Sequence, residues 1–151
     1  MMASVGPILL VEDNPDHAEL TTDAIRQGKT ANPCAWVEDA EAGLDYLYCR
    51  GAYADRQPGH PALVLLDLRL PGMDGLDMLE RVRQDDQFTA VPIVILTTSS
   101  QEAEMVRAYS HGANSYVVKP VAFDEFQETV RKLKGYWVLV NRTPGERGAV
   151  G

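Results

Sequence analysis

The sequence contains little cysteine and no long apolar segment. Its two cysteines, Cys34 and Cys49, form neither a disulfide framework nor a pair spaced for zinc, so we interpret both as packing residues. No run of about 18 apolar residues is present, and residues 1–7 lack the basic and apolar regions of a secretory signal. We therefore expect a cytosolic protein that does not enter a membrane.

Positive charge is also scarce. Lys and Arg total 14 against 22 Asp and Glu, which gives a net charge of -8 and a pI near 4.8. Such a chain repels phosphate backbones, which disfavours direct binding to nucleic acid. Its 151 residues, 45% hydrophobic and 24% charged, are typical of one packed globular domain.

Five short apolar runs are typical of strands buried on both faces of a parallel sheet. They cover residues 8–11, 34–37, 63–66, 93–96 and 116–118. Helical spacing follows each run: over 16–27, around 44–47, over 76–82, from a Ser99–Glu102 capping box to Gly112, and over 123–133. This alternation predicts right-handed crossovers and a doubly wound α/β domain with helices on both faces.

Two segments lie outside this alternation. Residues 50–61 form a connection that is long for a compact domain, and such loops are often functional, so we weigh a role in partner binding. Residues 136–140 form an apolar segment beyond the last helix, which either folds back on its own core or crosses to a second subunit. We favour a homodimer and expect the end of the chain to be loose.

Polar side chains follow four strands at the point where each one ends. Glu12 and Asp13 follow the first run, Asp67 the third, Thr97 the fourth and Lys119 the fifth. Because the carboxyl ends of parallel strands form the binding crevice, these groups are expected to meet. Two carboxylates about 4 Å apart repel by roughly 4 kcal/mol at an effective dielectric constant near 20, so a divalent cation such as Mg²⁺ would relieve the crowding.

A cation held by carboxylates beside a lysine and a hydroxyl is suited to phosphoryl transfer. Asp67 is the candidate nucleophile, since carboxylates form acyl phosphates, while Lys119 and Thr97 would contact phosphoryl oxygens. A flavin or nucleotide is the competing ligand. The loop over residues 12–16 carries carboxylates and a proline where such ligands need free amides, so we disfavour that alternative.

Residues 8–134 resemble the receiver domains of two-component response regulators, the CheY-like group. The resemblance rests on four motifs: Val11-Glu12-Asp13-Asn14, LDLRLPGMDG over residues 66–75, Leu96-Thr97-Thr98, and Tyr116-Val117-Val118-Lys119-Pro120. It implies a flavodoxin-like sheet of order 2-1-3-4-5. It also implies a receiver domain over residues 5–134 and a C-terminal extension over 135–151.

The same resemblance implies that Asp67 accepts a phosphoryl group from a phosphohistidine on a sensor histidine kinase. Mg²⁺ would be held by Asp13, Asp67 and the backbone carbonyl of Arg69, with Glu12 acting through water. Lys119 would bind the phosphoryl group.

Further roles follow from the resemblance. Thr97 and Tyr116 would form a switch pair, while Arg69 and Ser99 would influence how water reaches the acyl phosphate. The Lys119–Pro120 bond would be cis.

The chain further resembles the small response regulators of bacterial and cyanobacterial phytochromes. This likeness rests on the long connection, with Gly51-Ala52-Tyr53 and residues 56–61 (RQPGHP), and on Tyr136-Trp137 with residues 141–144 (NRTP) near the end. That likeness implies a stand-alone, homodimeric receiver phosphorylated by a light-sensing histidine kinase in a two-component phosphorelay. Such a protein is a signalling phospho-acceptor, not an enzyme: it catalyses only its own phosphorylation and dephosphorylation. With no DNA-binding or enzymatic output domain in the sequence, the output would be contact with a protein partner that the sequence does not identify.

Two other functions stay open. A receiver-shaped adaptor or dimerisation module would act without phosphorylation, although it would be expected to lose Asp67 or Lys119. A phosphohydrolase resembling the haloacid dehalogenase group would need a general acid two residues after the nucleophile, where this chain has Arg69.

The three histidines, His17, His60 and His111, are too scattered for a metal site and lack an obvious acid partner, so we interpret them as surface residues. Glu102 and Glu104 are interpreted as part of a solvated helix face.

Overall fold

The computed structural model describes residues 6–27 and 31–140. Five parallel strands form one sheet in the order β2-β1-β3-β4-β5. The strands are β1 (Ile8–Val11), β2 (Cys34–Val37), β3 (Leu63–Leu66), β4 (Ile93–Thr97) and β5 (Ser115–Val118). The predicted strands and the flavodoxin-like order are therefore confirmed, with β4 and β5 each one residue longer than expected.

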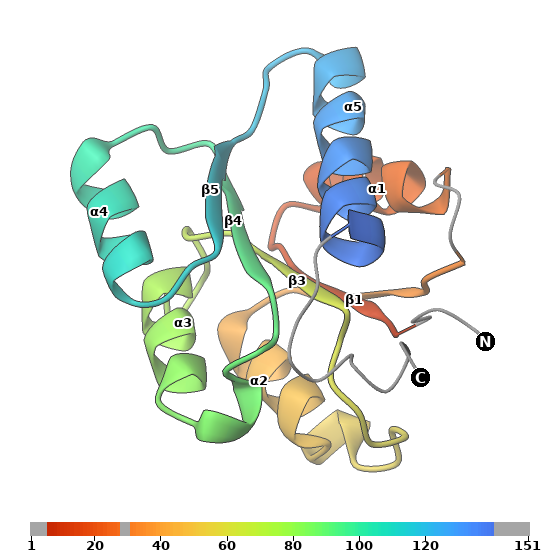
Figure 1. The fold of residues 1–151 in the computed structure, drawn as a ribbon, viewed down its shortest axis with the longest axis vertical. Coiled ribbons are helices and arrows are strands. Elements are labelled where there is room, and N and C mark those ends of the chain that lie inside the picture. Colours follow the sequence, from red (N-terminus) through yellow and green to blue (C-terminus); the bar gives the residue numbers. More distant parts are fainter. Residues whose placement is uncertain (1–5, 28–30, 141–151) are drawn as a thin grey trace.

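Five α-helices cover both faces of this sheet. They are α1 (Pro15–Arg26), α2 (Ala40–Tyr48), α3 (Gly75–Arg83), α4 (Glu102–Ser110) and α5 (Phe123–Lys134). Helices α1 and α5 lie together on one face, and α2, α3 and α4 lie on the other (Figure 1). This arrangement confirms the doubly wound fold.

The central strands are buried on both sides, which explains why they are continuously apolar. In β1, Leu9 and Val11 pack with the cluster under α2 and α3, whereas Ile8 and Leu10 pack with the cluster under α1 and α5. All four residues are no more than 2% exposed. With no solvated face, the strand has no positions that favour polar residues until its carboxyl end.

Two local expectations are wrong. Helix α4 begins at Glu102 after an N-cap at Gln101 that makes no side-chain cap bond, so Glu102 is the first helical residue and cannot close a capping box. The described residues contain no cis peptide bond, so the Lys119–Pro120 bond is trans. The two forms of such a bond differ by only about 0.5–1 kcal/mol, and the sequence alone does not decide between them.

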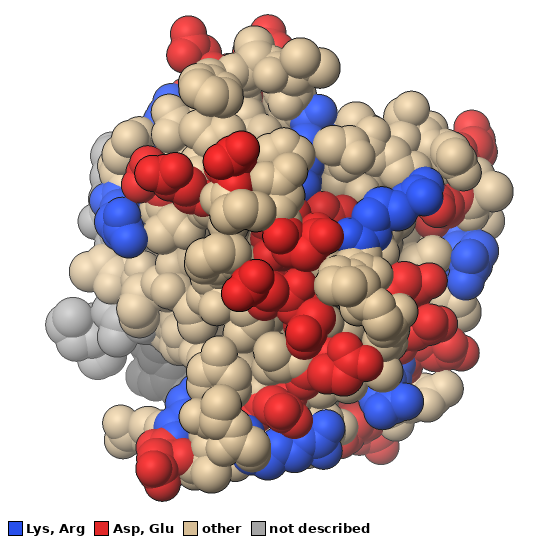
Figure 2. Space-filling model, turned by 180° about the vertical axis from the view of Figure 1, so that it is seen from behind, with Lys and Arg blue, Asp and Glu red and all other residues tan. Residues whose placement is uncertain are grey.

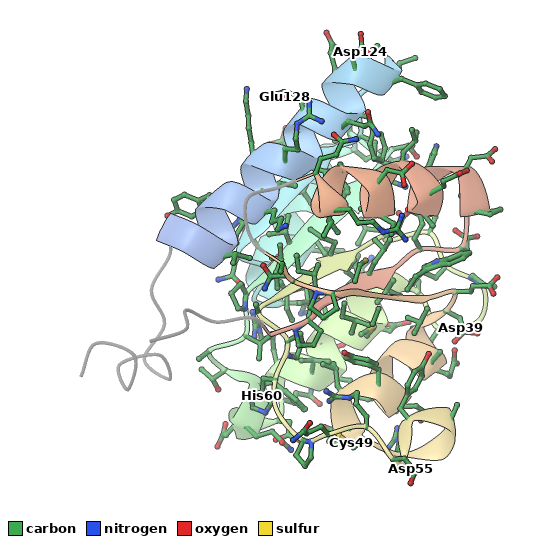
Figure 3. All side chains as sticks on the ribbon, turned by 90° about the vertical axis from the view of Figure 1, so that its right-hand side faces the viewer. Asp39, Cys49, Asp55, His60, Asp124 and Glu128 are labelled. Atoms are coloured by element: carbon green, nitrogen blue, oxygen red, sulfur yellow. The ribbon has the colours of Figure 1, made fainter. Side chains whose placement is uncertain are left out.

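The long connection between α2 and β3 packs against its neighbours. It contains the short helix η1 (Gly51–Tyr53), and Arg56 Nε donates to the carbonyl of Tyr46 at 2.9 Å. The ring of His60, labelled in Figure 3, lies 4.9 Å from that of Phe88 in η2 (Asp86–Phe88). A role of this loop in partner binding stays a prediction.

The last described segment, η3 (Gly135–Val140), continues directly from α5 as a π-helix. Trp137 and Val138 pack against the cluster under α1 and α5, so this part of the apolar segment folds back on its own core. Tyr136 is 49% exposed. The predicted loose end, residues 141–151, lies outside the described residues.

Neither cysteine of the described chain is in a disulfide, and both are half-buried. Cys34 packs against the α1 and α5 cluster, as expected for a packing residue, whereas Cys49 ends α2 with a φ of 53°. Across residues 6–27 and 31–140, no helix has the length and apolar character needed to cross a bilayer.

Candidate functional site

The carboxyl ends of the strands deliver the predicted polar groups to one edge of the sheet. The backbone N–H of Asp67 donates to the carbonyl of Val11 at 3.1 Å, which aligns the ends of β3 and β1. The backbone N–H of Lys119 donates to the carbonyl of Thr97 at 2.7 Å, which aligns the ends of β5 and β4. The hydrogen bonds between the parallel strands therefore fix the backbone positions from which these side chains extend.

The ammonium of Lys119 binds two of the carboxylates. Its Nζ lies 2.6 Å from Oε1 of Glu12 and 2.9 Å from Oδ2 of Asp67. The side chains of Lys119 and Glu12 are each 2% exposed, and that of Asp67 is 8% exposed. Because solvent screens such buried charges weakly, these are strong charge-assisted hydrogen bonds.

One lysine cannot neutralise the whole cluster. Carboxylate oxygens of Glu12, Asp13 and Asp67 all lie within 4.8 Å of one another, so three negative charges face one positive charge. Burial raises the pKa of Glu12 above its usual value, and the ion pair with Lys119 opposes part of that rise. A hard divalent cation prefers oxygen ligands of this kind and would supply the missing positive charge. The donor set fits such an ion.

Short local bonds hold Glu12 and the start of α1 in place. The second oxygen of Glu12, Oε2, accepts from the backbone N–H of Asn14 at 3.0 Å. Asn14 in turn caps α1, because its Oδ1 accepts from the backbone N–H groups of Asp16 and His17. The indole of Trp36 donates to the Glu12 carbonyl at 2.7 Å.

The loop after β3 approaches α3 too closely for any residue but glycine at position 75. A Cβ on Gly75 would lie 2.2 Å from the carbonyl oxygen of Asp67 and 2.8 Å from the Cα of Leu68. The backbone N–H of Arg69 reaches back to Oδ1 of Asp67 at 3.3 Å. The conformation of residues 67–75 therefore positions the Asp67 carboxylate.

Thr97 and Tyr116 both contact Ser99 at the start of the β4–α4 loop. Thr97 is fully buried, and its Oγ1 accepts from the backbone N–H of Ser99 at 3.4 Å. The hydroxyl of half-buried Tyr116 donates to the carbonyl of Ser99 at 2.9 Å. The two side chains are thus linked through one residue of the loop.

The family model for the response regulator receiver domain matches residues 8–131. The chain belongs to this family. Receiver domains are signalling modules, and the acidic cluster described above is where they hold a divalent metal.

Individual relatives agree with this assignment. The chain is 41% identical over 138 residues to the probable methanogenesis regulatory protein FilR2 of Methanothrix harundinacea. This match covers 91% of the present chain and 87% of FilR2. Its structure is similar to that of the phosphorylated cyanobacterial phytochrome response regulator RcpA, with 29% identity and a TM-score of 0.86. The match covers 92% of the present chain and 98% of RcpA. It is also similar to the Mn²⁺-bound response regulator Rcp1 of Synechocystis, with 27% identity and a TM-score of 0.84. That match covers 92% of the present chain and 99% of Rcp1.

In this receiver domain Glu104 is not part of a purely solvated face. Its carboxylate accepts from the Oγ of Ser99 and lies 3.1 Å from Nη2 of Arg69. The expectation that Glu104 only faces water is therefore wrong, because it joins the loops that follow β3 and β4. No local motif marks this contact, which depends on how α4 packs.

The expectation that His17 is a surface residue is also wrong. It is half-buried in the first turn of α1, and its Nδ1 lies 2.9 Å from Nζ of Lys119. The available signal was its position four residues after Asp13, in the first turn of a helix that starts at the crevice. His60 is exposed, as expected, and His111 is half-buried at the end of α4.

Acidic residues also gather on the molecular surface. Figure 2 shows Asp and Glu side chains in a broad band across one face, interrupted by few basic side chains. This distribution agrees with the net charge of -8.

Proposed function

We propose that the protein is a phospho-acceptor response regulator, in which Asp67 takes a phosphoryl group from the phosphohistidine of a sensor histidine kinase. The observation that carries this proposal is the buried ammonium of Lys119, hydrogen-bonded to Asp67 and Glu12 beside a third carboxylate, Asp13. Because histidine kinases are charged by ATP, we place this exchange in the cytosol.

The transfer is a displacement at phosphorus. An oxygen of the Asp67 carboxylate forms the new P–O bond as the P–N bond to the kinase imidazole breaks, and that nitrogen keeps the electron pair. Lys119 moves one hydrogen bond from Asp67 to a phosphoryl oxygen, and the Thr97 hydroxyl binds another. Bound Mg²⁺, held by Asp13, Asp67 and the Arg69 carbonyl with Glu12 acting through water, would neutralise charge on the phosphoryl oxygens. The protein acts catalytically only on its own phosphorylation and dephosphorylation.

We further propose that Thr97 and Tyr116 respond to phosphorylation as a switch pair. When Thr97 turns its hydroxyl toward a phosphoryl oxygen, its contact with the Ser99 N–H is lost, and the Ser99 carbonyl that accepts from Tyr116 is free to shift. Such a change is a shift between two existing populations, driven by a few kcal/mol of differential stabilisation.

Intact-mass measurement with a small acyl phosphate tests the proposal. Wild type should gain one phosphoryl group in the presence of Mg²⁺ and none in excess chelator. Asp67→Asn should gain none. Asp74→Asn is the matched control, because Asp74 lies seven residues further along the same loop and only caps α3 through the N–H of Asp77, a role that Asn fills equally well. If wild type gains no mass, the receiver-shaped adaptor that works without phosphorylation replaces this proposal. A mass gain that persists in Asp67→Asn would refute Asp67 as the acceptor.

A phytochrome is the first histidine kinase we would test as the donor, because RcpA, which this chain resembles over 92% of its length, is a phytochrome response regulator. Purified kinases, including a phytochrome under red and under far-red light, would be mixed with the protein, and the transferred phosphate counted. Transfer from other kinases but not from the phytochrome would refute this choice of partner while leaving the phospho-acceptor proposal intact.

We propose a receiver domain over residues 5–134, followed by an extension over 135–151 that contributes to a homodimer. Tyr136 supports this, because an aromatic residue that is 49% exposed is suited to an interface. Sedimentation equilibrium should report a dimer for wild type and a weaker one for Tyr136→Asp. A monomeric wild type would refute it.

A further inference from the structure

Lys119 makes one hydrogen bond more than its pairing with the carboxylates requires. An ammonium carries three protons, and three acceptors surround this one: Oε1 of Glu12 at 2.6 Å, Oδ2 of Asp67 at 2.9 Å and Nδ1 of His17 at 2.9 Å. All three donors are therefore used. Together the three bonds hold the ammonium group beside Asp67.

The contact with Lys119 defines the protonation state and the tautomer of His17. A lysine ammonium can only donate, so Nδ1 of His17 must carry a lone pair and the ring proton must sit on Nε2. A protonated imidazole would have no lone pair at Nδ1 and would place a second positive charge beside Lys119. The hydrogen bond exists only while His17 is neutral.

The position of the His17 ring is set by helix packing. Its backbone N–H donates to the capping oxygen of Asn14 at 3.2 Å, which anchors the residue in the first turn of α1. The ring centroid lies 5.7 Å from that of Phe126 on α5. Helices α1 and α5 pack side by side along this face (Figure 1). The imidazole is therefore held beside the crevice by the fold.

The groups around His17 favour its neutral form. Burial, followed by the charge of Lys119, lowers the pKa of His17, while the carboxylates of Asp67, Asp16 and Asp13 oppose that shift. The ring also lines a groove of about 480 Å³, to which α1 contributes two more carboxylates, those of Glu19 and Asp23. The β5–α5 loop and α5 contribute only apolar residues to this groove: Pro120, Val121, Phe123 and Phe126. Glu12 faces the same ammonium from the end of β1.

We propose that His17 is a positioning residue for phosphoryl transfer: its neutral imidazole holds Lys119 in place while that lysine exchanges a carboxylate oxygen of Asp67 for a phosphoryl oxygen. The inference rests on the proposed phosphorylation of Asp67. During the exchange the bonds to Glu12 and His17 persist, so the ammonium turns toward the phosphoryl group without leaving the crevice. Acid that protonates His17 removes one of these two bonds.

Two variants separate the acceptor from the bulk of the ring. His17→Gln offers an amide oxygen and does not titrate, whereas His17→Leu fills similar space with no acceptor. With a small acyl phosphate and Mg²⁺ at about pH 7.5, His17→Leu should react about tenfold more slowly than wild type, and His17→Gln should recover most of that loss. Equal rates for wild type and His17→Leu would overturn the proposal.

The pH profile supplies a readout that a merely structural role would not change. As the pH falls from about 7.5 through the pKa of His17, as NMR measures it, the ratio of the wild-type rate to the His17→Gln rate should fall, since only wild type loses its acceptor by protonation. His60→Gln, which removes an exposed imidazole distant from the crevice, should keep the wild-type profile. A constant ratio of wild type to His17→Gln would contradict the proposal.

A spectroscopic measurement on wild type does not depend on phosphorylation. Long-range proton–nitrogen NMR should show His17 as the Nε2–H tautomer at neutral pH, with a pKa below its ordinary value of about 6.5. The Nδ1–H tautomer would refute the positioning role even if Asp67 is phosphorylated. Conversely, failure of wild type to accept any phosphoryl group would refute the proposed function and leave the measured tautomer as evidence for the contact with Lys119.

Discussion

Neutralising Asp13 is expected to stabilise the protein when metal is absent. Oxygens of Asp13, Glu12 and Asp67 lie within 4.8 Å of one another. At that distance two unit charges repel by about 0.9 kcal/mol in bulk water and by about 3.5 kcal/mol at an effective dielectric constant of about 20. Asp13 is exposed and Lys119 offsets part of the repulsion, so the repulsion energy lies nearer the bulk-water value than the buried one. We therefore expect Asp13→Asn to raise the free energy of unfolding by about 1–2 kcal/mol.

The sign of this change is diagnostic, because most substitutions destabilise a protein. Urea denaturation followed by circular dichroism would compare wild type and Asp13→Asn in excess chelator and in excess Mg²⁺. Added metal should stabilise wild type through binding to the folded state and should stabilise the variant much less. Asp16→Asn is the control: it removes an exposed carboxylate of the first α1 turn, outside the cluster, and should cost about 0.5 kcal/mol of helix-dipole stabilisation. Destabilisation by Asp13→Asn in chelator, or an unchanged wild type on adding metal, would refute the electrostatic reasoning.

Three further outcomes follow from the structure. Gly75→Ala should lower the free energy of unfolding by about 2 kcal/mol or more in urea denaturation, and should slow phosphorylation, because the new Cβ collides with the backbone of Asp67 and Leu68. Gly135→Ala is the control: a Cβ there has nothing within 4 Å, so this substitution should leave the stability unchanged or raise it. Arg83→Met should lower the free energy of unfolding by about 2–4 kcal/mol, because the guanidinium donates hydrogen bonds to three backbone carbonyls and an asparagine side chain. The control Arg81→Met replaces an exposed arginine and should change that free energy by no more than about 0.5 kcal/mol. Equal effects of the two substitutions in urea denaturation would contradict this prediction. In chelator, the raised pKa of Glu12 means that the folded state binds its proton more tightly than the unfolded state, so stability should fall as pH rises from about 4.5 through that pKa, and Glu12→Gln should lack this component.

The strands and the rim of the crevice were predictable because both follow from burial. A strand buried on both faces admits polar residues only where it ends, so each apolar run marks its own boundary, and a parallel sheet brings those ends together. Glu12, Asp67 and Lys119 therefore meet as the sequence implied, and their hydrogen bonds show it.

The two missed contacts depend on how helices pack, which short motifs do not encode. His17 reaches Lys119 because α1 turns that face toward α5, and Glu104 reaches Ser99 and Arg69 because α4 starts two residues after the expected position. The capping-box pattern at Ser99 is present in the sequence. Its hydroxyl is committed to Glu104 and its carbonyl to Tyr116, so the residue belongs to the loop and α4 begins at residue 102.

Locating the modified residue tests the central claim most directly. After reaction with an acyl phosphate in Mg²⁺, borohydride converts an aspartyl phosphate to homoserine, and tandem mass spectrometry of the digested protein finds its position. Our account predicts homoserine at position 67 alone, and none when chelator replaces Mg²⁺. Homoserine at another position, or at 67 to the same extent without metal, would contradict it.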